Sequence, residues 1–222
     1  MNLNTIYFLH EIGGKKTQED YIWPPAGTAS AEDKIFIICD GVGGSENGEL
    51  ASKLISEFVA SALQEIPAST LSATVINDIL LQAQQKLIDH AAQYALNTDM
   101  ATTFTLLVLN DDKAFIAWCG DSRVYHIRKE SVLYKTSDHS LVNTLVKKGE
   151  ITEQEARSHP QKNIILKAIK ADYSPIEAEA NWITNIEDGD YFMLCTDGLL
   201  ENISDNELTF LLRQENTNSN GL

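Results

Sequence analysis

The sequence predicts an α+β fold built as a layered sandwich, and three observations favour it. Two amphipathic segments follow each other at residues 50–63 and 71–87, so a pair of helices can cover one face of a sheet. Several short strands follow between residues 102 and 134, with connections too short for parallel crossovers. Strands and helices then occur again toward the C-terminus. This order is typical of an α+β sandwich rather than a doubly wound fold.

Apolar runs of strand length and amphipathic runs of helix length follow each other along the chain. In order we expect a strand at 5–12, a turn at 13–16, a strand ending at Asp40, helices at 50–63 and 71–87, strands at 102–109, 114–119, 123–127 and 132–134, a helix at 141–148, and further strands that end at Asp197. The strands between residues 102 and 134 should form one antiparallel meander. Capping-box patterns at Thr152–Glu155 and Ser204–Glu207 mark two more helix starts, and the polar tail 216–221 is expected to fray.

Length and charge narrow the classes of function. The chain has 222 residues, of which 43% are hydrophobic, so residues 1–222 can form a single domain with a large core. Its formal net charge of −15 disfavours a nucleic acid or an anionic membrane as a partner, because no basic patch is available to release counterions. Residues 1–10 lack the pattern of a signal peptide and no apolar run has the length of a membrane helix, so we expect a cytoplasmic protein.

Three apolar strands end at an aspartate beside a glycine. The runs are KIFIICDG, AFIAWCGD and YFMLCTDG, and the aspartates are Asp40, Asp121 and Asp197. Carboxylates on tight turns at one edge of a sheet can converge on a hard cation, so the pattern indicates a magnesium or manganese site. Each Asp-Gly pair is also an ordinary turn when taken alone. A soft-metal site built from Cys39, Cys119 and Cys195 is disfavoured, because carboxylates beside glycine carbonyls suit Mg²⁺ or Mn²⁺ better.

Seven short motifs occur in the order seen in metal-dependent protein serine/threonine phosphatases of the PPM type. They are Glu19-Asp20, Asp40-Gly41-Val42-Gly43-Gly44, Ala101-Thr102-Thr103, Gly120-Asp121-Ser122-Arg123, Ser137-Asp138-His139-Ser140, His159-Pro160 and Thr196-Asp197-Gly198-Leu199. From about residue 5 to 212 the chain resembles this family, and its short bacterial members most. The resemblance implies an α-β-β-α sandwich, in which two antiparallel sheets are flanked by helix pairs and hold a two-metal site at one end. It also implies hydrolysis of phosphoserine and phosphothreonine in proteins by a metal-activated water, with a cognate kinase.

The resemblance further implies roles for individual residues. Asp40 would bridge two Mg²⁺ or Mn²⁺ ions, while the Gly41 carbonyl and Asp197 would each bind one of them. Glu19 and Asp20 would orient metal-bound waters, and Asp121 would bind a third ion. Without the resemblance, Glu19 and Asp20 are interpreted as solvated loop charges and Asp121 as a hairpin-turn residue. His139 is interpreted as structural, and residues 147–159 correspond to a mobile flap near the active site in bacterial members.

The sequence departs from the family pattern at three places. Many members have an arginine near Lys15 that grips the phosphate, so Lys15 or Lys16 would bind it less directionally, as a point charge. Val42 stands where some relatives have a histidine that is a candidate general acid. The family also continues past the last helix with a further helix and a strand whose aspartate is a metal ligand. We therefore expect a domain that is incomplete at its C-terminus, because it is naturally short, truncated or completed by another chain.

Three classes of function follow. The first is a Mg²⁺- or Mn²⁺-dependent phosphatase that acts on phosphoproteins. The second is a weak or inactive phosphatase-like domain that binds a phosphoprotein or a regulatory partner, because its metal site is incomplete. The third, a metal-dependent phosphodiesterase or nuclease, is disfavoured by the net charge and by the lack of a basic or aromatic groove.

Overall fold

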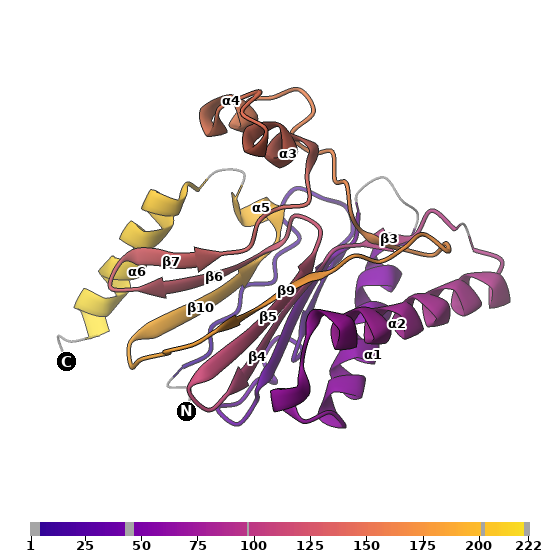
Figure 1. Cartoon of the computed structure of the whole chain (residues 1–222), viewed down its shortest axis with the longest axis horizontal. Coiled ribbons are helices and arrows are strands. Elements are labelled where there is room, and N and C mark those ends of the chain that lie inside the picture. The colour runs from indigo at the N-terminus through magenta and orange to yellow at the C-terminus, as the bar shows by residue number, and fades with distance from the viewer. Residues whose placement is uncertain (1–4, 43–46, 97, 201–202, 220–222) are drawn as a thin grey trace.

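The computed structural model describes residues 5–42, 47–96, 98–200 and 203–219, and its centre consists of two antiparallel sheets (Figure 1). The larger sheet contains, in spatial order, β1 (Asp20–Trp23), β2 (Ile35–Asp40), β4 (Phe104–Asn110), β5 (Lys113–Cys119) and β9 (Glu179–Ile183). The smaller sheet contains β10 (Asp190–Cys195), β6 (Arg123–Arg128) and β7 (Ser131–Lys135). A further two-stranded sheet pairs β3 (Ala101–Thr102) with β8 (Ile169–Lys170).

Two long helices cover the outer face of the larger sheet (Figure 1). These are α1 (Gly48–Gln64) and α2 (Ala73–Gln93), separated by the short 3₁₀ helix η1 (Ala68–Thr70). Ser72 caps α2 by accepting a hydrogen bond from the Val75 amide, at 3.2 Å. Ile55 of α1 and Leu80 of α2 are fully buried in one cluster with Phe104 of the sheet. The predicted helix pair and its role are confirmed.

The alternation of side chains along β4 separates two layers of the core. Leu106 and Val108 pack in the cluster beneath the helices, whereas Leu107 and Leu109 pack in a second cluster between the two sheets. Successive residues of a strand point to opposite faces, so one strand contributes to both layers. The almost continuous apolar run of β4 is explained by this burial on both faces.

The outer face of the smaller sheet is covered by α6 (Asp205–Ser219), which follows the one-turn helix α5 (Asp197–Leu200). Leu208 of α6 is buried in a third cluster with Tyr125, Ile127 and Cys195. The layers therefore run helices, sheet, sheet, helix (Figure 1). This order confirms the predicted α+β layered sandwich.

The strand expected at residues 5–12 is wrong. This segment is irregular, and Tyr7 and Leu9 are 79% and 73% exposed. The first strand is β1, which pairs with β2. An extended apolar segment becomes a strand only where a neighbouring edge shares its hydrogen bonds, and in the described ranges no strand pairs with residues 5–12.

The predicted single meander is wrong at one connection. β4 pairs with β5 and β6 pairs with β7, as expected, but β5 and β6 belong to different sheets. The chain changes sheet at Gly120, whose φ is +119°. A Cβ at this glycine would come within 2.7 Å of the Thr103 Cβ. Only glycine allows both this backbone conformation and this close approach.

Two element ends also differ from expectation. β10 ends at Cys195, and Asp197 begins α5 instead of ending a strand. The polar residues expected to fray belong to α6 as far as Ser219, and residues 220 and 221 of the tail lie outside the described residues. Both capping boxes are confirmed: the Thr152 amide bonds to Glu155 at 2.7 Å, and the Ser204 amide bonds to Glu207 at 2.8 Å.

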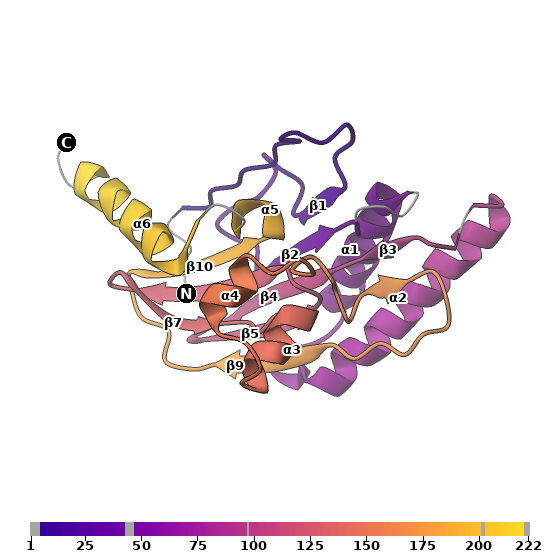
Figure 2. The same cartoon turned by 90° about the horizontal axis from the view of Figure 1, so that it is seen from above.

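A flap, defined here as residues 141–164, projects from one end of the sandwich and contains α3 (Leu141–Lys147) and α4 (Glu153–Arg157) (Figure 1). Its two ends meet, since the Leu141 amide donates to the Ile164 carbonyl at 2.9 Å. Seen from above, α3 and α4 lie over the strands β4 and β5 (Figure 2). Among the described residues, the structure contains no helix long and apolar enough to cross a membrane.

Candidate metal centre

Three carboxylates meet at the end of the sandwich from which the flap projects. β1 and β2 are antiparallel and place Asp20 directly opposite Asp40. Asp197 follows β10, and the hydroxyl of Thr196, one residue before it, donates to the Asp20 carboxylate at 3.2 Å. Three segments far apart in the sequence thus bring Asp20, Asp40 and Asp197 together. These residues and Asp121 are called the carboxylate cluster below.

The backbone of Asp40 is held by the Ala101-Thr102-Thr103 motif. The Asp40 carbonyl accepts hydrogen bonds from the Thr103 amide at 2.8 Å and from the Thr102 hydroxyl at 2.9 Å. The Asp40 amide donates to the Thr103 hydroxyl at 3.0 Å, and that hydroxyl also bonds to the Ser122 hydroxyl at 2.8 Å. These contacts fix Asp40 at the end of its strand. The sequence contained Thr102, Thr103 and Ser122 as motif residues, but no local signal indicated that they position Asp40.

Gly41 lies where two backbones touch. A Cβ at Gly41 would come within 2.5 Å of the Gly48 backbone at the start of α1. The Gly41 amide donates to the Glu19 carbonyl at 3.0 Å. This position therefore requires glycine, and it brings the residue after Asp40 close to the loop that carries Glu19. The structure places Gly41 beside the cluster, where a backbone ligand is expected.

The electrostatics of Asp40 show that the cluster lacks charge compensation. Burial, together with the negative charges of Asp20 and Asp197 and a hydrogen bond shared with Asp20, raises the pKa of Asp40 to about 9. The nearby Lys15 opposes this shift without cancelling it. Burial and neighbouring like charges thus disfavour the ionised form of Asp40. A divalent ion bound at the cluster would stabilise that form.

Asp121 lies near Asp197, in the turn between β5 and β6. Burial and the charges of Asp197 and Asp138 raise the pKa of Asp121 to about 7. Asp138 itself is held by Arg123 through two hydrogen bonds of 2.6 Å. The charge of Arg123 opposes the raised pKa of Asp121 without cancelling it, because the guanidinium is bonded to Asp138.

Lys15 and Glu19 form an ion pair at the edge of the cluster. The Lys15 ammonium lies 3.0 Å from the Glu19 carboxylate. Partial burial lowers the pKa of Lys15, but the hydrogen bond with Glu19 and the charges of Asp40, Glu19 and Asp20 outweigh it, so the pKa is raised. Glu19 is also anchored through its carbonyl, which accepts a hydrogen bond from the Ser52 hydroxyl at 2.6 Å. The structure thus brings both residues to the cluster, and neither is a freely solvated loop charge.

The donor set fits a hard cation with an incomplete shell of protein ligands. In the part of the chain that the structure describes, no group of three or more Asp, Glu, His or Cys side chains could hold a metal ion by itself. Mg²⁺ typically keeps several waters and takes one or two carboxylates, so it does not need such a group. The three cysteines are buried free thiols, and burial raises the pKa of Cys119 and Cys195 to about 12. This chemistry disfavours a thiolate site.

His139 supports the turn that carries Asp121. Its Nδ1 accepts a hydrogen bond from the Gly120 amide at 3.1 Å, so the proton lies on Nε2, which bonds to Glu179 at 3.0 Å. The ring stacks on Trp118, with centroids 6.1 Å apart. Burial lowers the pKa of His139. These contacts occupy both ring nitrogens, in agreement with the structural interpretation.

Comparisons with known proteins give a consistent result. Residues 10–218 match the model of the family described as Protein phosphatase 2C. Protein phosphatase PhpP of Streptococcus pneumoniae is 33% identical over 210 residues, which cover 91% of this chain and 82% of the relative. Serine/threonine phosphatase stp of Listeria innocua serovar 6a is 31% identical over 197 residues, which cover 86% of this chain and 77% of the relative.

A solved structure agrees in fold and in sequence. The crystal structure of serine/threonine phosphatase Stp1 from Staphylococcus aureus has a TM-score of 0.80 and 30% identity, and the match covers 96% of this chain and 84% of that one. The residues matched by the family model include the flap, both sheets and the carboxylate cluster. The chain therefore belongs to the protein phosphatase 2C family.

Proposed function

We propose that this protein hydrolyses phosphoserine and phosphothreonine in proteins, with two Mg²⁺ or Mn²⁺ ions at the carboxylate cluster. The observation that carries the proposal is the meeting of Asp20, Asp40 and Asp197 from three elements, where Lys15 opposes the raised pKa of Asp40 without cancelling it. Relatives named as serine/threonine phosphatases support the type of reaction. A cognate Ser/Thr kinase would supply the phosphorylated protein.

Each residue of the cluster has a proposed part. Asp40 would bridge the two ions, because a bridging ligand needs two usable oxygens and Asp40 is held at its backbone on both sides. The Gly41 carbonyl and Asp197 would each bind one ion. Glu19 and Asp20 would orient waters, and Asp121 would hold a third, accessory ion. When bound, such ions supply Lewis acidity that activates a water and stabilises charge on the phosphoryl group.

Lys15 is proposed to hold the phosphate of the substrate. Its side chain is 53% exposed, and its ammonium lies within electrostatic reach of Asp40. Its ion pair with Glu19 keeps the ammonium near the cluster before substrate arrives. A lysine offers three donors around a point charge, so it can follow the phosphate as the reaction proceeds but does not fix its orientation as an arginine would.

The test is phosphate release from a phosphothreonine peptide in the presence of Mn²⁺, with Asp40→Asn and Asp197→Asn. Asparagine keeps the size of the side chain but removes the charge, so we expect each variant to lose activity about 1,000-fold, or about 4 kcal/mol. Asp188→Asn is the matched control, since Asp188 is exposed in the turn before β10. Undiminished activity in both cluster variants would falsify the proposal.

The second candidate is a domain that binds phosphoproteins without hydrolysing them. It is not favoured, because proteins named as phosphatases match most of the chain. Calorimetric titration with Mn²⁺ separates the two candidates. An enzyme should take up manganese at the cluster and lose this uptake in Asp40→Asn, whereas a binding-only domain should show no such heat.

A further inference from the structure

Three cations around the carboxylate cluster are used by acidic partners of the same chain. Lys15 pairs with Glu19 at 3.0 Å, and Arg123 binds Asp138 through two hydrogen bonds. Lys167, between the flap and β8, pairs with Glu177 at 3.1 Å. In a chain with 32 acidic and 17 basic residues, such pairing is expected. A cation near the site without such a partner can bind an acidic group from outside the chain.

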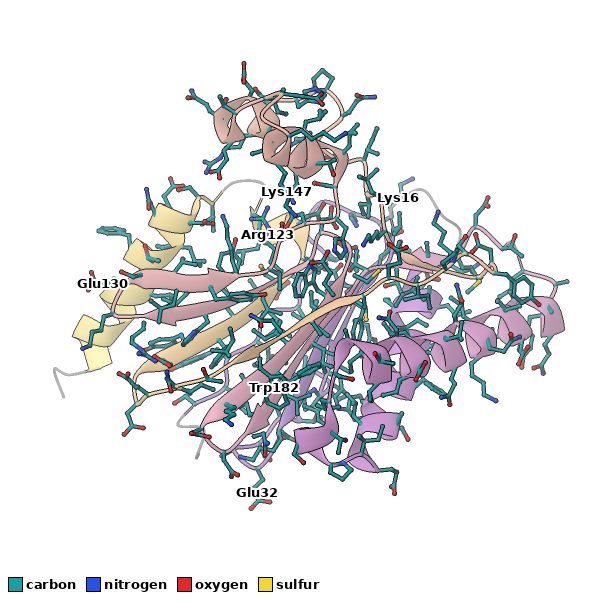
Figure 3. All side chains as sticks on the ribbon, in the orientation of Figure 1. Lys16, Glu32, Arg123, Glu130, Lys147 and Trp182 are labelled. Atoms are coloured by element: carbon teal, nitrogen blue, oxygen red, sulfur yellow. The ribbon has the colours of Figure 1, made fainter. Side chains whose placement is uncertain are left out.

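Lys147 is such a cation. It is exposed at the last turn of α3, and within the described ranges it forms no ion pair or side-chain hydrogen bond. Figure 3 shows Lys147 between the flap and Arg123, at the end of the sandwich that carries the cluster. Its positive charge acts on His139, whose ring nitrogen and backbone amide both bond to Gly120, beside Asp121. Lys147 therefore lies on the side of the flap that faces the site.

The flap reaches across this end of the molecule. At one side, Lys147 of α3 lies near the turn of Gly120 and Asp121. At the other side, the charge of Arg157 in α4 acts on Glu207, near the start of α6. The flap projects from the end of the sandwich that carries the cluster (Figure 1), so a polypeptide with its phosphorylated residue at the cluster would have neighbouring residues close to the flap.

We propose that Lys147 is a specificity residue that binds an acidic side chain next to the phosphorylated residue of the substrate. The proposal rests on the phosphatase function proposed above. Lys147 breaks no existing ion pair when it binds such a side chain, so the contact costs less than it would for Lys15 or Arg123. Its selectivity would be for Asp or Glu beside the phosphorylated residue.

The negative net charge of the protein does not prevent Lys147 from binding an acidic side chain of the substrate. A formal charge of −15 repels an acidic peptide at long range, but at physiological ionic strength the screening length is about 8 Å. Within that distance the nearest charges decide the interaction. For a side chain beneath the flap, Lys147 is such a nearby charge, and the divalent ions proposed above would offset the carboxylates of the cluster itself.

Lys148 provides a matched control on the same helix end. It has the same charge and is also exposed, and within the described ranges it has no ion pair. The next residue of a helix points about 100° away around the axis. A change at Lys148 alters the net charge equally but does not alter the face toward the site.

The experiment compares kcat/KM, with Mn²⁺, for two phosphothreonine peptides of equal length, one with glutamates flanking the phosphothreonine and one with glutamines. We expect the wild type to prefer the acidic peptide. Lys147→Ala should lower kcat/KM for the acidic peptide by about 5-fold through KM, while leaving the neutral peptide within about 2-fold. Lys147→Glu should reverse the preference, and 0.5 M salt should weaken it in the wild type.

Three results would overturn the inference: no preference in the wild type, an equal loss for both peptides in Lys147→Ala, or the same loss in Lys148→Ala. The last result would mean that only net charge matters. A failure of the phosphatase function is distinguishable from all three. In that case the wild type would hydrolyse neither peptide nor p-nitrophenyl phosphate at any manganese concentration.

Discussion

The two ends of the strand pair β6/β10 lie beside carboxylates in opposite electrostatic surroundings. At one end, Asp197 follows Cys195 and joins the carboxylate cluster, in which the pKa of Asp40 is raised to about 9. At the other end, Asp190 begins β10, and its side chain is 1% exposed. The carboxylate of Asp190 lies 2.5 Å from Arg128 and 2.8 Å from His126. The two ends are roughly 20 Å apart along the strand.

The contacts of Asp190 and Asp40 explain why the pKa of the first is lowered and that of the second is raised. Burial raises the pKa of Asp190, but the hydrogen bonds from Arg128, the Glu187 amide and His126 outweigh it, so this pKa is lowered. At Asp40, burial and like charges act in the same direction. A carboxylate with cationic partners supports the fold, whereas clustered carboxylates without partners are tolerated where a ligand supplies the charge.

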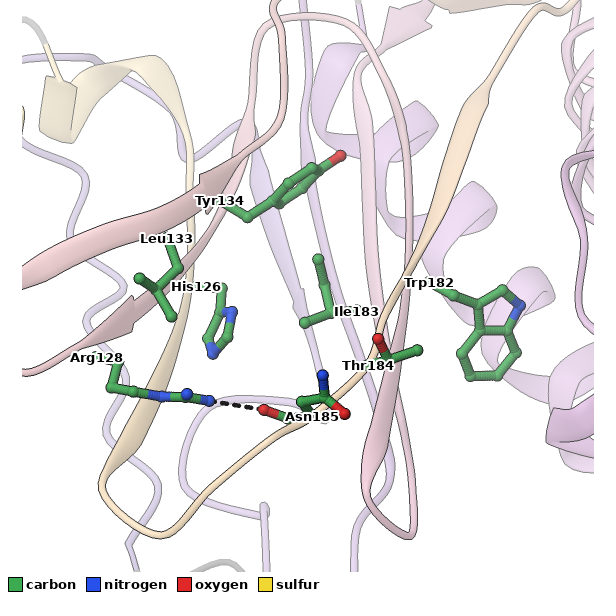
Figure 4. A pocket seen from close by; sticks show the side chains of 8 residues that line it. All are labelled: His126, Arg128, Leu133, Tyr134, Trp182, Ile183, Thr184 and Asn185. Carbon is green, nitrogen blue, oxygen red and sulfur yellow. Dashed lines mark hydrogen bonds between the residues drawn. The ribbon is translucent and has the colours of Figure 1, made fainter.

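A groove of about 380 Å³ lies at the compensated end, between β7 and β9 (Figure 4). Arg128 and His126 line it, yet both are already bound to Asp190. Arg128 also donates to the Asn185 carbonyl at 2.7 Å and to Glu187 at 2.7 Å. Arg128, the cation that lines this groove, is therefore already bonded to acceptors of the protein itself. A groove alone therefore does not indicate a site, whereas carboxylates with raised pKa values do.

The largest effect should come from supplying the missing charge. Free Mn²⁺ at about 1,000 times its dissociation constant should raise the free energy of unfolding by about 4 kcal/mol. Asp40→Asn should lose most of this gain, whereas Asp190→Asn should keep it. In chelator, Asp40→Asn should be at least as stable as the wild type, because the change removes like-charge repulsion.

Denaturant unfolding with EDTA and with manganese measures both quantities. If Asp40→Asn were clearly less stable than the wild type in EDTA, the carboxylate would already be compensated within the protein. The contrast between the two ends of the strand pair would then be wrong.

Asp190→Asn should have the next largest effect, and on stability alone. Removal of one partner from a buried ion pair costs about 3 kcal/mol, since Arg128 and His126 remain partly desolvated without it. Activity per folded molecule should not change. Asp188→Asn, in the same turn but exposed, should change stability by less than about 0.5 kcal/mol. Loss of activity in folded Asp190→Asn would show that this end also serves the reaction.

The stability difference between the wild type and Asp190→Asn should depend on pH in a direction that the pKa of Asp190 determines. An unfolded aspartate has a pKa of about 3.9, and the pKa of Asp190 is lowered in the folded protein. Its contribution is therefore present above about pH 4 and is lost as the pH falls toward the lowered value. The stability difference between wild type and Asp190→Asn should shrink below pH 4. A difference that grows on acidification would contradict the assignment.

The sequence predicted the features that depend on local patterns. Helix periodicity located α1 and α2, and the capping boxes located the starts of α4 and α6. The change of sheet after β5 was not predictable, because side-chain alternation is the same whether the next strand joins the same sheet or another. It depends on the close contact of Gly120 with Thr103, which are 17 residues apart.

The candidate site was predicted only in part, because some of its contacts also join residues that are far apart in the sequence. Aspartates at strand ends and the family motifs pointed to Asp40, Asp121 and Asp197 before their meeting was visible. The Asp190 cluster was missed because its partner Arg128 lies 62 residues away and no motif links them. Likewise, the hydrogen bonds between Thr103 and Asp40 join positions 63 residues apart. Pairings of this kind follow from strand register, which the sequence does not state.

The smallest expected effect comes from removing a hydrogen bond that positions Asp40, with no change in the charge of the cluster. Thr103→Val keeps the shape of the side chain but removes the hydroxyl that accepts from the Asp40 amide at 3.0 Å. We expect a stability loss of about 1 kcal/mol and a manganese affinity about 10-fold weaker, because Asp40 is less firmly positioned. Calorimetric titration with Mn²⁺ and denaturant unfolding measure the two effects.

Thr105→Val is the matched control, two residues further along β4. Its buried hydroxyl donates to the Ile38 carbonyl at 2.9 Å, so its loss should cost a similar amount of stability. That bond lies one two-residue strand repeat further along the chain than the bond to Asp40, and it touches no carboxylate. Manganese affinity should therefore stay within about 2-fold of the wild type in Thr105→Val. Equal weakening in both variants would mean that general loosening of β4, rather than the bond to Asp40, controls the site, and the positioning role of Thr103 would be refuted.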